Sequence, residues 1–73
     1  MATMKITSEV TGSVWKVLKA AGDTVNPGEE VALIESMKME IPVICEDGGR
    51  VQQIHVSEGD PVAEGQLIAT VER

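Results

Sequence analysis

An internal repeat of 37 residues constrains the fold of this chain more than any other feature of its sequence. Shifting the chain by that distance places residues 12–35 on residues 49–72 without a gap, and eight of the 24 aligned positions are identical. Most of these residues are types that form turns or face a core in strands. The repeat therefore predicts two structurally equivalent halves. The identical pairs are Gly12 and Gly49, Val14 and Val51, Gly22 and Gly59, Asp23 and Asp60, Val25 and Val62, Gly28 and Gly65, Ala32 and Ala69, and Glu35 and Glu72.

The residue types and the turn sequences predict an all-β fold. The chain contains ten Val and six Ile but only three Leu. The β-branched side chains of Val and Ile suit strands better than helices. No segment keeps a helical apolar period over several turns, whereas Asn26-Pro27-Gly28 and Asp47-Gly48-Gly49 are favourable turn sequences. Strands are expected near residues 3–8, 13–19, 24–26, 31–35, 40–45, 50–56, 61–63 and 67–72.

We expect residues 1–73 to form a single domain with half-repeats at about residues 3–36 and 40–73. Each half is too small to bury its own apolar face, so the halves should pack on one another. The expected architecture is a flattened antiparallel barrel-sandwich of two four-stranded sheets with an internal pseudo-twofold repeat. A chain of 7.8 kDa buries about 60% of its surface. That leaves too little room to enclose a catalytic cleft, a cofactor pocket and a second substrate.

Charge and hydropathy patterning exclude several classes of partner. The formal net charge is −6, which disfavours nucleic acid and anionic membrane surfaces. No apolar run approaches the length of a membrane span, and no signal-peptide pattern follows Met1. Cys45 is the single cysteine and cannot form an internal disulfide, which fits a reducing compartment. We therefore expect a cytoplasmic protein.

The isolated reactive side chains predict no metal or redox site. Cys45 and His55 provide too few ligands for structural zinc, which needs four. We interpret Cys45 as a small buried hydrophobic residue and His55 as an ordinary exposed or strand-edge residue. The glycines lack the spacing of phosphate-binding loops. Trp15 is either a core residue or a partly exposed interface residue, and the sequence does not distinguish the two.

The junction between the halves contradicts ordinary turn composition. The first repeat ends at Glu35, and the next strand is expected to begin near Glu40. The chain must therefore reverse within residues 36–39, which contain no Gly, Pro, Asn or Asp. Met37 and Met39 then lie at a hairpin tip, where they gain little burial. The alternative is one strand from Val31 to Ile44 with both methionines in the core, which is longer than usual strands and breaks the repeat. We expect a hairpin tip that is kept for recognition.

The residues at this tip resemble a known attachment motif. Glu35-Ser36-Met37-Lys38-Met39-Glu40 is similar to the motif of biotinyl domains in the biotin/lipoyl attachment domain family, where a lysine between two methionines receives biotin. The resemblance covers about residues 6–72 and includes residues 12–17, residues 49–51 and both Gly-Asp turns. Ser36 stands where the family usually has alanine. The protruding thumb of some acetyl-CoA carboxylase carriers is missing, which fits either a free-standing carrier or a domain of a longer chain.

The resemblance implies a biotin carboxyl carrier. A biotin protein ligase would attach biotin to Lys38 as an amide. The arm would then shuttle a carboxyl group from a biotin carboxylase to a carboxyltransferase. Recognition by the ligase and the other partners would fall on the neighbours of the lysine, which are Glu35, Ser36, Met37, Met39 and Glu40.

The residues around Lys38 do not activate its amine. A lysine amine is ordinarily protonated at neutral pH, and Glu35 and Glu40 favour the charged form. The ligase must therefore supply the deprotonation and the activated acyl group, so we expect Lys38 to be a substrate and the chain to contain no catalytic residue. Two alternatives stay open. Lys38 carries lipoate, instead of biotin or in addition to it, or the chain is an unmodified adaptor of the same fold.

Overall fold

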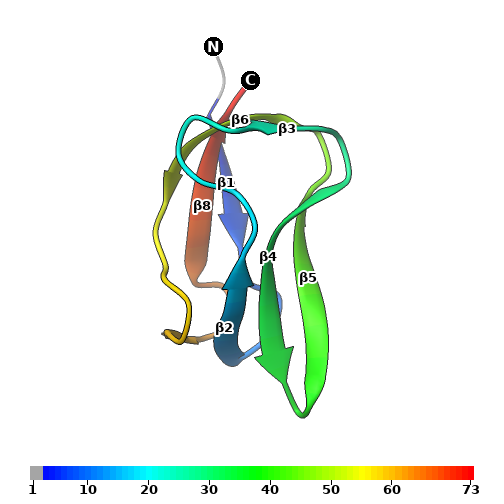
Figure 1. The fold of residues 1–73 in the computed structure, drawn as a ribbon, viewed down its shortest axis with the longest axis vertical. Helices are drawn as coiled ribbons and strands as arrows, with labels where there is room; N and C mark the ends of the chain where they lie inside the picture. The colour runs from blue at the N-terminus through cyan, green and yellow to red at the C-terminus, as the bar shows by residue number, and fades with distance from the viewer. Residues whose placement is uncertain (1–2) are drawn as a thin grey trace.

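The computed structural model describes residues 3–73, and all regular secondary structure in that range is β-strand (Figure 1). The predicted all-β fold is confirmed, with β4 longer at both ends than expected and β6 ending at Ile54, just before His55. Within the described residues no helix is long and apolar enough to cross a membrane. The strands are β1 (Thr3–Thr7), β2 (Gly12–Val17), β3 (Thr24–Val25), β4 (Glu29–Ser36), β5 (Met39–Cys45), β6 (Gly49–Ile54), β7 (Pro61–Val62) and β8 (Leu67–Glu72).

The strands form two four-stranded antiparallel sheets, as predicted. One sheet has the order β1-β8-β6-β3 and the other has the order β5-β4-β2-β7. We call them the first sheet and the hairpin sheet. A shift of 37 residues converts one order into the other, and each sheet takes two strands from each half of the chain. Each half therefore depends on the other to complete its sheets.

The repeat is reproduced in the hydrogen bonds between loops and strands. The Val14 N–H donates to the Asp60 carbonyl oxygen over 2.8 Å, and the Val51 N–H donates to the Asp23 carbonyl oxygen over the same distance. A break in register follows Val14 in β2, and the equivalent break follows Val51 in β6. Such bulges bend a strand and increase its twist. The pseudo-twofold relation inferred from identical residues thus extends to the backbone geometry.

The core between the sheets is aliphatic. Strand β5 alternates between inward-facing Ile41, Val43 and Cys45 and outward-facing exposed residues, the pattern of a strand with one buried face. Cys45 is buried as a free thiol among hydrophobic residues, as predicted. The buried apolar residues are Val14, Val25, Val31, Ala32, Ile34, Val43, Cys45, Val51, Val56, Val62, Ile68, Ala69 and Val71.

Two glycines of the repeat bring strands close together. A Cβ atom on Gly12 would overlap the carbonyl oxygen of Glu35 in the neighbouring strand β4. At the equivalent place, a Cβ atom on Gly49 would lie 2.6 Å from the carbonyl oxygen of Glu72. Both glycines are needed because the backbones approach too closely for a side chain. Gly12 therefore allows β2 to approach β4 closely at Glu35, one residue before the end of β4.

The molecule is elongated, with extents of 36 × 17 × 17 Å. The start of β1 and the end of β8 lie at one end, and the turn between β4 and β5 lies at the other (Figure 1). This β4–β5 hairpin carries the residues that the sequence analysis selected as a site.

Candidate functional site

The chain reverses direction at Met37 and Lys38, so the alternative of one continuous strand is wrong. Ser36 pairs with Met39 across the two-residue connection. Met37 has φ of 53° and Lys38 has φ of 65°. Positive φ at both central residues defines a type I′ turn, whose twist matches that of the flanking strands. The turn usually contains Asn-Gly, because larger side chains are strained at positive φ.

All three residues at the tip project into solvent. Met37 is 90% exposed and Met39 is 59% exposed, and Lys38 is exposed between them. Within residues 3–73, the Lys38 Nζ has no salt-bridge partner, whereas the Lys19 Nζ lies 3.1 Å from a Glu29 carboxylate oxygen. The amine of Lys38 is therefore presented without an internal partner that would have to be displaced.

Ser36 anchors the base of the hairpin. Its hydroxyl donates a hydrogen bond of 2.8 Å to the carbonyl oxygen of Thr11, in the loop between β1 and β2. The Thr11 hydroxyl in turn accepts a hydrogen bond of 3.2 Å from the backbone N–H of Glu64. Sequence reasoning treated Ser36 only as a small neighbour of the lysine. It missed this contact because the partner is a backbone oxygen 25 residues away, and no local pattern marks it.

Glu35 and Glu40 lie directly opposite each other in the antiparallel register of β4 and β5. Both residues are exposed. Like charges at opposed positions of an antiparallel pair destabilise it. The hairpin therefore keeps two carboxylates next to the turn at some cost to its own stability. All six residues selected from the sequence, Glu35 to Glu40, are brought together by this hairpin.

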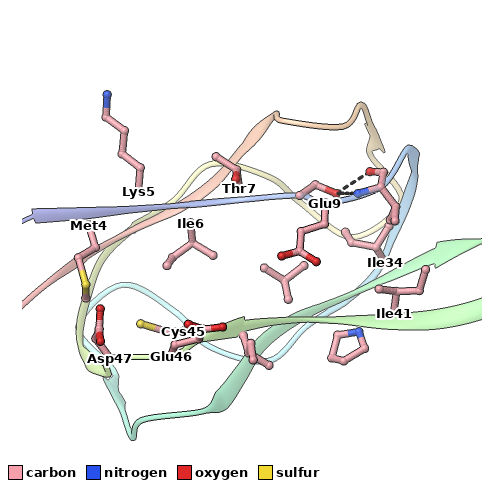
Figure 2. Close-up of a pocket in the computed structure, with 15 residues that line it drawn as sticks. Met4, Lys5, Ile6, Thr7, Glu9, Ile34, Ile41, Cys45, Glu46 and Asp47 are labelled. Carbon is pink, nitrogen blue, oxygen red and sulfur yellow. Dashed lines mark hydrogen bonds between the residues drawn. The ribbon is translucent and has the colours of Figure 1, made fainter.

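A separate groove of about 580 Å³ lies between the edge strands β1 and β5 (Figure 2). Ile6 points into it, whereas Lys5 and Thr7 point away. Its lining includes Ile41 but not the turn residues Met37 and Lys38. Within residues 3–73, no group of three His, Cys, Asp or Glu side chains is placed to hold a metal ion. Because its lining does not include the turn residues, the groove is distinct from the lysine site.

The structure also places the two single residues of uncertain role. Trp15 is 48% exposed and lies at the bulge of β2, so it is a partly exposed residue and not a core residue. His55 is exposed and follows β6 directly. Neither contributes to the hairpin tip.

One exposed carboxyl group has a pKa displaced from its ordinary value. The backbone N–H of Asn26 donates to Glu29 over 2.9 Å and, together with the Lys19 side chain, lowers the pKa of the Glu29 carboxyl. Glu29 is the first residue of β4, whereas the hairpin turn at Met37 and Lys38 follows the last residue of that strand. The shift therefore belongs to the Asn26–Glu29 turn and not to the lysine site.

The geometry suits acylation by a second protein. A primary amine on a two-residue turn, at the end of an elongated sheet structure, is accessible to a separate active site. The two sheets hold the hairpin, and Ser36 and Gly12 fix its base. An acyl group on this amine would extend the lysine side chain away from the sheets.

Comparisons with known proteins agree with this arrangement. The family model described as "Biotin-requiring enzyme", for biotin and lipoyl attachment, matches residues 1–71. A biotin/lipoyl attachment protein of Bacillus subtilis (strain 168) is 43% identical over 65 residues, which are 89% of this chain and 89% of that protein. A biotin carboxyl carrier protein of Streptococcus mutans is 38% identical over 60 residues, 82% of this chain and 46% of that protein.

Other relatives are much longer proteins. The dihydrolipoyllysine-residue succinyltransferase component of the 2-oxoglutarate dehydrogenase complex of Staphylococcus saprophyticus is 38% identical over 60 residues, 82% of this chain but 14% of that protein. The crystal structure of the Kluyveromyces lactis urea carboxylase superposes with a TM-score of 0.92 at 38% identity, over 99% of this chain and 6% of that one. The chain therefore belongs to the biotin/lipoyl attachment domain family.

Proposed function

We propose that Lys38 is the attachment site of biotin and that the chain acts as a biotin carboxyl carrier. The observation that carries this proposal is the type I′ turn, which holds the Lys38 amine in solvent between two exposed methionines. A purely structural hairpin would gain stability from Asn-Gly at these two positions. The presence of Met37 and Lys38 at these two positions supports a functional role for the turn.

The attachment is an acyl transfer to nitrogen. The Lys38 Nζ forms an amide bond to the carboxyl carbon of biotin, the activating group leaves that carbon, and the amine loses a proton. No salt-bridge partner of Lys38 lies within the described residues, so the enzyme that modifies the lysine supplies the base. Bound biotin would supply the ring that accepts and releases a carboxyl group, and the chain would supply the arm that moves it.

The neighbours of Lys38 support recognition by partner enzymes. Met37 and Met39 expose their side chains, and flexible apolar methionines adapt to different binding surfaces. Glu35 and Glu40 add two carboxylates beside the turn. A biotin protein ligase, a biotin carboxylase and a carboxyltransferase are the partners that we propose for these residues. The match to a biotin carboxyl carrier protein supports this set.

Lipoylation of Lys38 is the second candidate. The dihydrolipoyllysine-residue succinyltransferase component is 38% identical to this chain over 60 residues, and the hairpin would present a lipoyl group equally well. The methionines on both sides of Lys38 favour biotin, because the sequence around the lysine resembles the biotinyl motif.

The deciding experiment is the intact mass and peptide map of the protein produced in cells that contain both biotin and lipoyl ligases. We expect one biotinyl group, located on Lys38. Lys38→Arg should keep the fold and the charge but lose binding to avidin. A lipoyl group on Lys38 would replace the proposal by the second candidate. An unmodified Lys38 beside active ligases would indicate an adaptor, and biotin on Lys5, Lys16 or Lys19 would refute the site.

A further inference from the structure

The internal repeat provides a built-in comparison between the two outer faces of the molecule. Every outward position of the hairpin sheet has a counterpart 37 residues away on the first sheet, in the same strand geometry. Residues needed only for the fold should be of similar character at the two counterparts. A consistent difference therefore marks what one face does beyond folding.

Apolar side chains gather on the outer face of the hairpin sheet, beside the exposed Lys16 of β2. Trp15, Leu18 and Ile44 are 48%, 37% and 40% exposed, respectively. Leu33 lies at its centre, opposite Pro42 in β5 and opposite Lys16 in β2. We call this set the outer patch, and it consists of Trp15, Leu18, Leu33, Pro42 and Ile44.

The counterparts on the first sheet are all polar. They are, in the same order, Gln52, His55, Thr70, Lys5 and Thr7. Figure 2 shows Lys5 and Thr7 pointing away from the interior, which confirms the outward direction of these two positions in β1. At one further pair the polarity is reversed, because half-buried Leu67 in the first sheet corresponds to Glu30 in the hairpin sheet. The first sheet thus folds with polar residues at all five counterparts, so this strand geometry does not by itself require an apolar outer patch.

Acidic residues flank the outer patch at both ends of β4, with Glu35 and Glu40 beside the turn and Glu30 near the start of the strand. Glu35 and Glu40 lie opposite each other next to Leu33 and Pro42, and Glu30 lies opposite Ile44. A second copy of the chain, which itself has a net charge of −6, would bring carboxylates against carboxylates at this face. A partner with an apolar centre and Lys or Arg toward the hairpin tip complements both features.

We propose that the outer patch is the docking surface for the biotin protein ligase that modifies Lys38, an inference that rests on the proposed function. The ligase must bring its active site to the lysine amine itself. The distance between the ligase surface and the turn is therefore no more than about the length of the Lys38 side chain. The hairpin sheet continues from that turn without interruption (Figure 1). A carboxylase reaches a group at the end of the longer biotinyl-lysine arm and needs less contact with the sheet.

The test replaces the patch by the residues of its own counterparts. Trp15→Gln, Leu33→Thr and Ile44→Thr are combined in one variant, which places on the hairpin sheet the residues found at 52, 70 and 7. Initial rates are measured with a purified biotin protein ligase, biotin and ATP at varied concentrations of unmodified carrier. We expect KM for the carrier to rise about tenfold or more, with kcat at saturating carrier within about twofold. Thermal unfolding of each protein verifies that the fold is kept.

A matched control changes the other face. Thr7→Ala, Gln52→Ala and Thr70→Ala, also combined, should leave both KM and kcat within about twofold of the parent. A charge test uses Glu35→Gln with Glu40→Gln. The parent KM should rise with NaCl because salt screens attraction between charged surfaces, and this dependence should weaken in the double variant.

The outcomes separate the two proposals. If the ligase does not biotinylate the parent protein, the proposed function fails and the docking inference fails with it. If the parent is biotinylated but the patch variant keeps the parent KM, the docking inference alone is overturned. Concentration-dependent dimerisation in sedimentation that the patch variant abolishes would assign the patch to a second copy, which also overturns the inference.

Discussion

The Ser36 hydroxyl donates a hydrogen bond of 2.8 Å to the carbonyl oxygen of Thr11. The bond joins the last residue of β4 to the loop between β1 and β2. It therefore connects the hairpin that carries Lys38 to a segment outside that hairpin.

Removing this hydrogen bond should destabilise the protein modestly. Ser36→Ala is expected to lower the free energy of unfolding by about 1 kcal/mol, the usual net value of one intramolecular hydrogen bond. Ser36→Thr retains the hydroxyl and serves as the control. Urea unfolding measures both variants. Equal midpoints for the parent and Ser36→Ala would show that the bond contributes nothing to stability.

The turn residues should be replaceable with a gain in stability. Met37→Asn with Lys38→Gly introduces the residue pair preferred in type I′ turns and relieves positive φ at two large side chains. We expect the free energy of unfolding to rise by about 1 kcal/mol, while biotinylation is lost. Urea unfolding of the unmodified proteins provides the measurement. A destabilised variant would contradict the turn geometry.

The two methionines should matter more for modification than for the fold. Because both are exposed, Met37→Asp with Met39→Ala should change stability by at most about 0.5 kcal/mol. Biotinylation or later carboxyl transfer should decrease, and lipoylation should improve. Thermal melts and rates with purified biotin and lipoyl ligases test this. A variant that melts far below the parent but is modified and carboxylated at unchanged rates would show that the methionines support the core.

Neither half of the chain should fold alone. Each sheet contains strands from both halves. Fragment 1–36 therefore lacks the partners of β1 and β3, and fragment 37–73 lacks the partners of β5 and β7. We expect both fragments to be disordered in NMR spectra, while the intact chain unfolds in a single transition. A dispersed spectrum from one isolated fragment would mean that the halves are independent units.

Acid should remove a stabilising contribution from Glu29. Its pKa is lowered by the Asn26 N–H and by Lys19, so the ionised group favours the folded state. This contribution is present above the pKa of an unfolded glutamate, about 4.3, and is lost as the pH falls through the lowered value in the folded protein. Glu29→Gln should therefore be less stable than the parent at neutral pH, and the difference should shrink in acid.

The repeat supplies the control for this titration. Gln66 occupies the equivalent position, and its side-chain oxygen accepts a hydrogen bond of 3.0 Å from the Ala63 N–H. Gln66→Ala removes the same kind of bond without a titrating group, so its effect should not change between neutral and acidic pH. A pH-independent difference between the parent and Glu29→Gln would contradict the lowered pKa.

The sequence alone determined the architecture to a large degree. Gly-Asp turns and branched aliphatic residues recur at a spacing of 37, and strands follow from such local patterns because side chains alternate between two faces. The same repeat located the reversal at residues 36–39, since a continuous strand would have broken it. Lys38 was identified at the centre of that symmetry and by its resemblance to an attachment motif.

Only the tertiary structure decided the contacts between distant residues. Positive φ at Met37 and Lys38 is imposed by the pairing and twist of β4 and β5, against the local preference of both residues. The contact of Ser36 with Thr11 depends on the approach of two segments that no local pattern relates. The outer patch gathers Trp15, Leu33 and Pro42 from three strands. Their assembly on one face depends on register and bulges, which local alternation in the sequence does not specify.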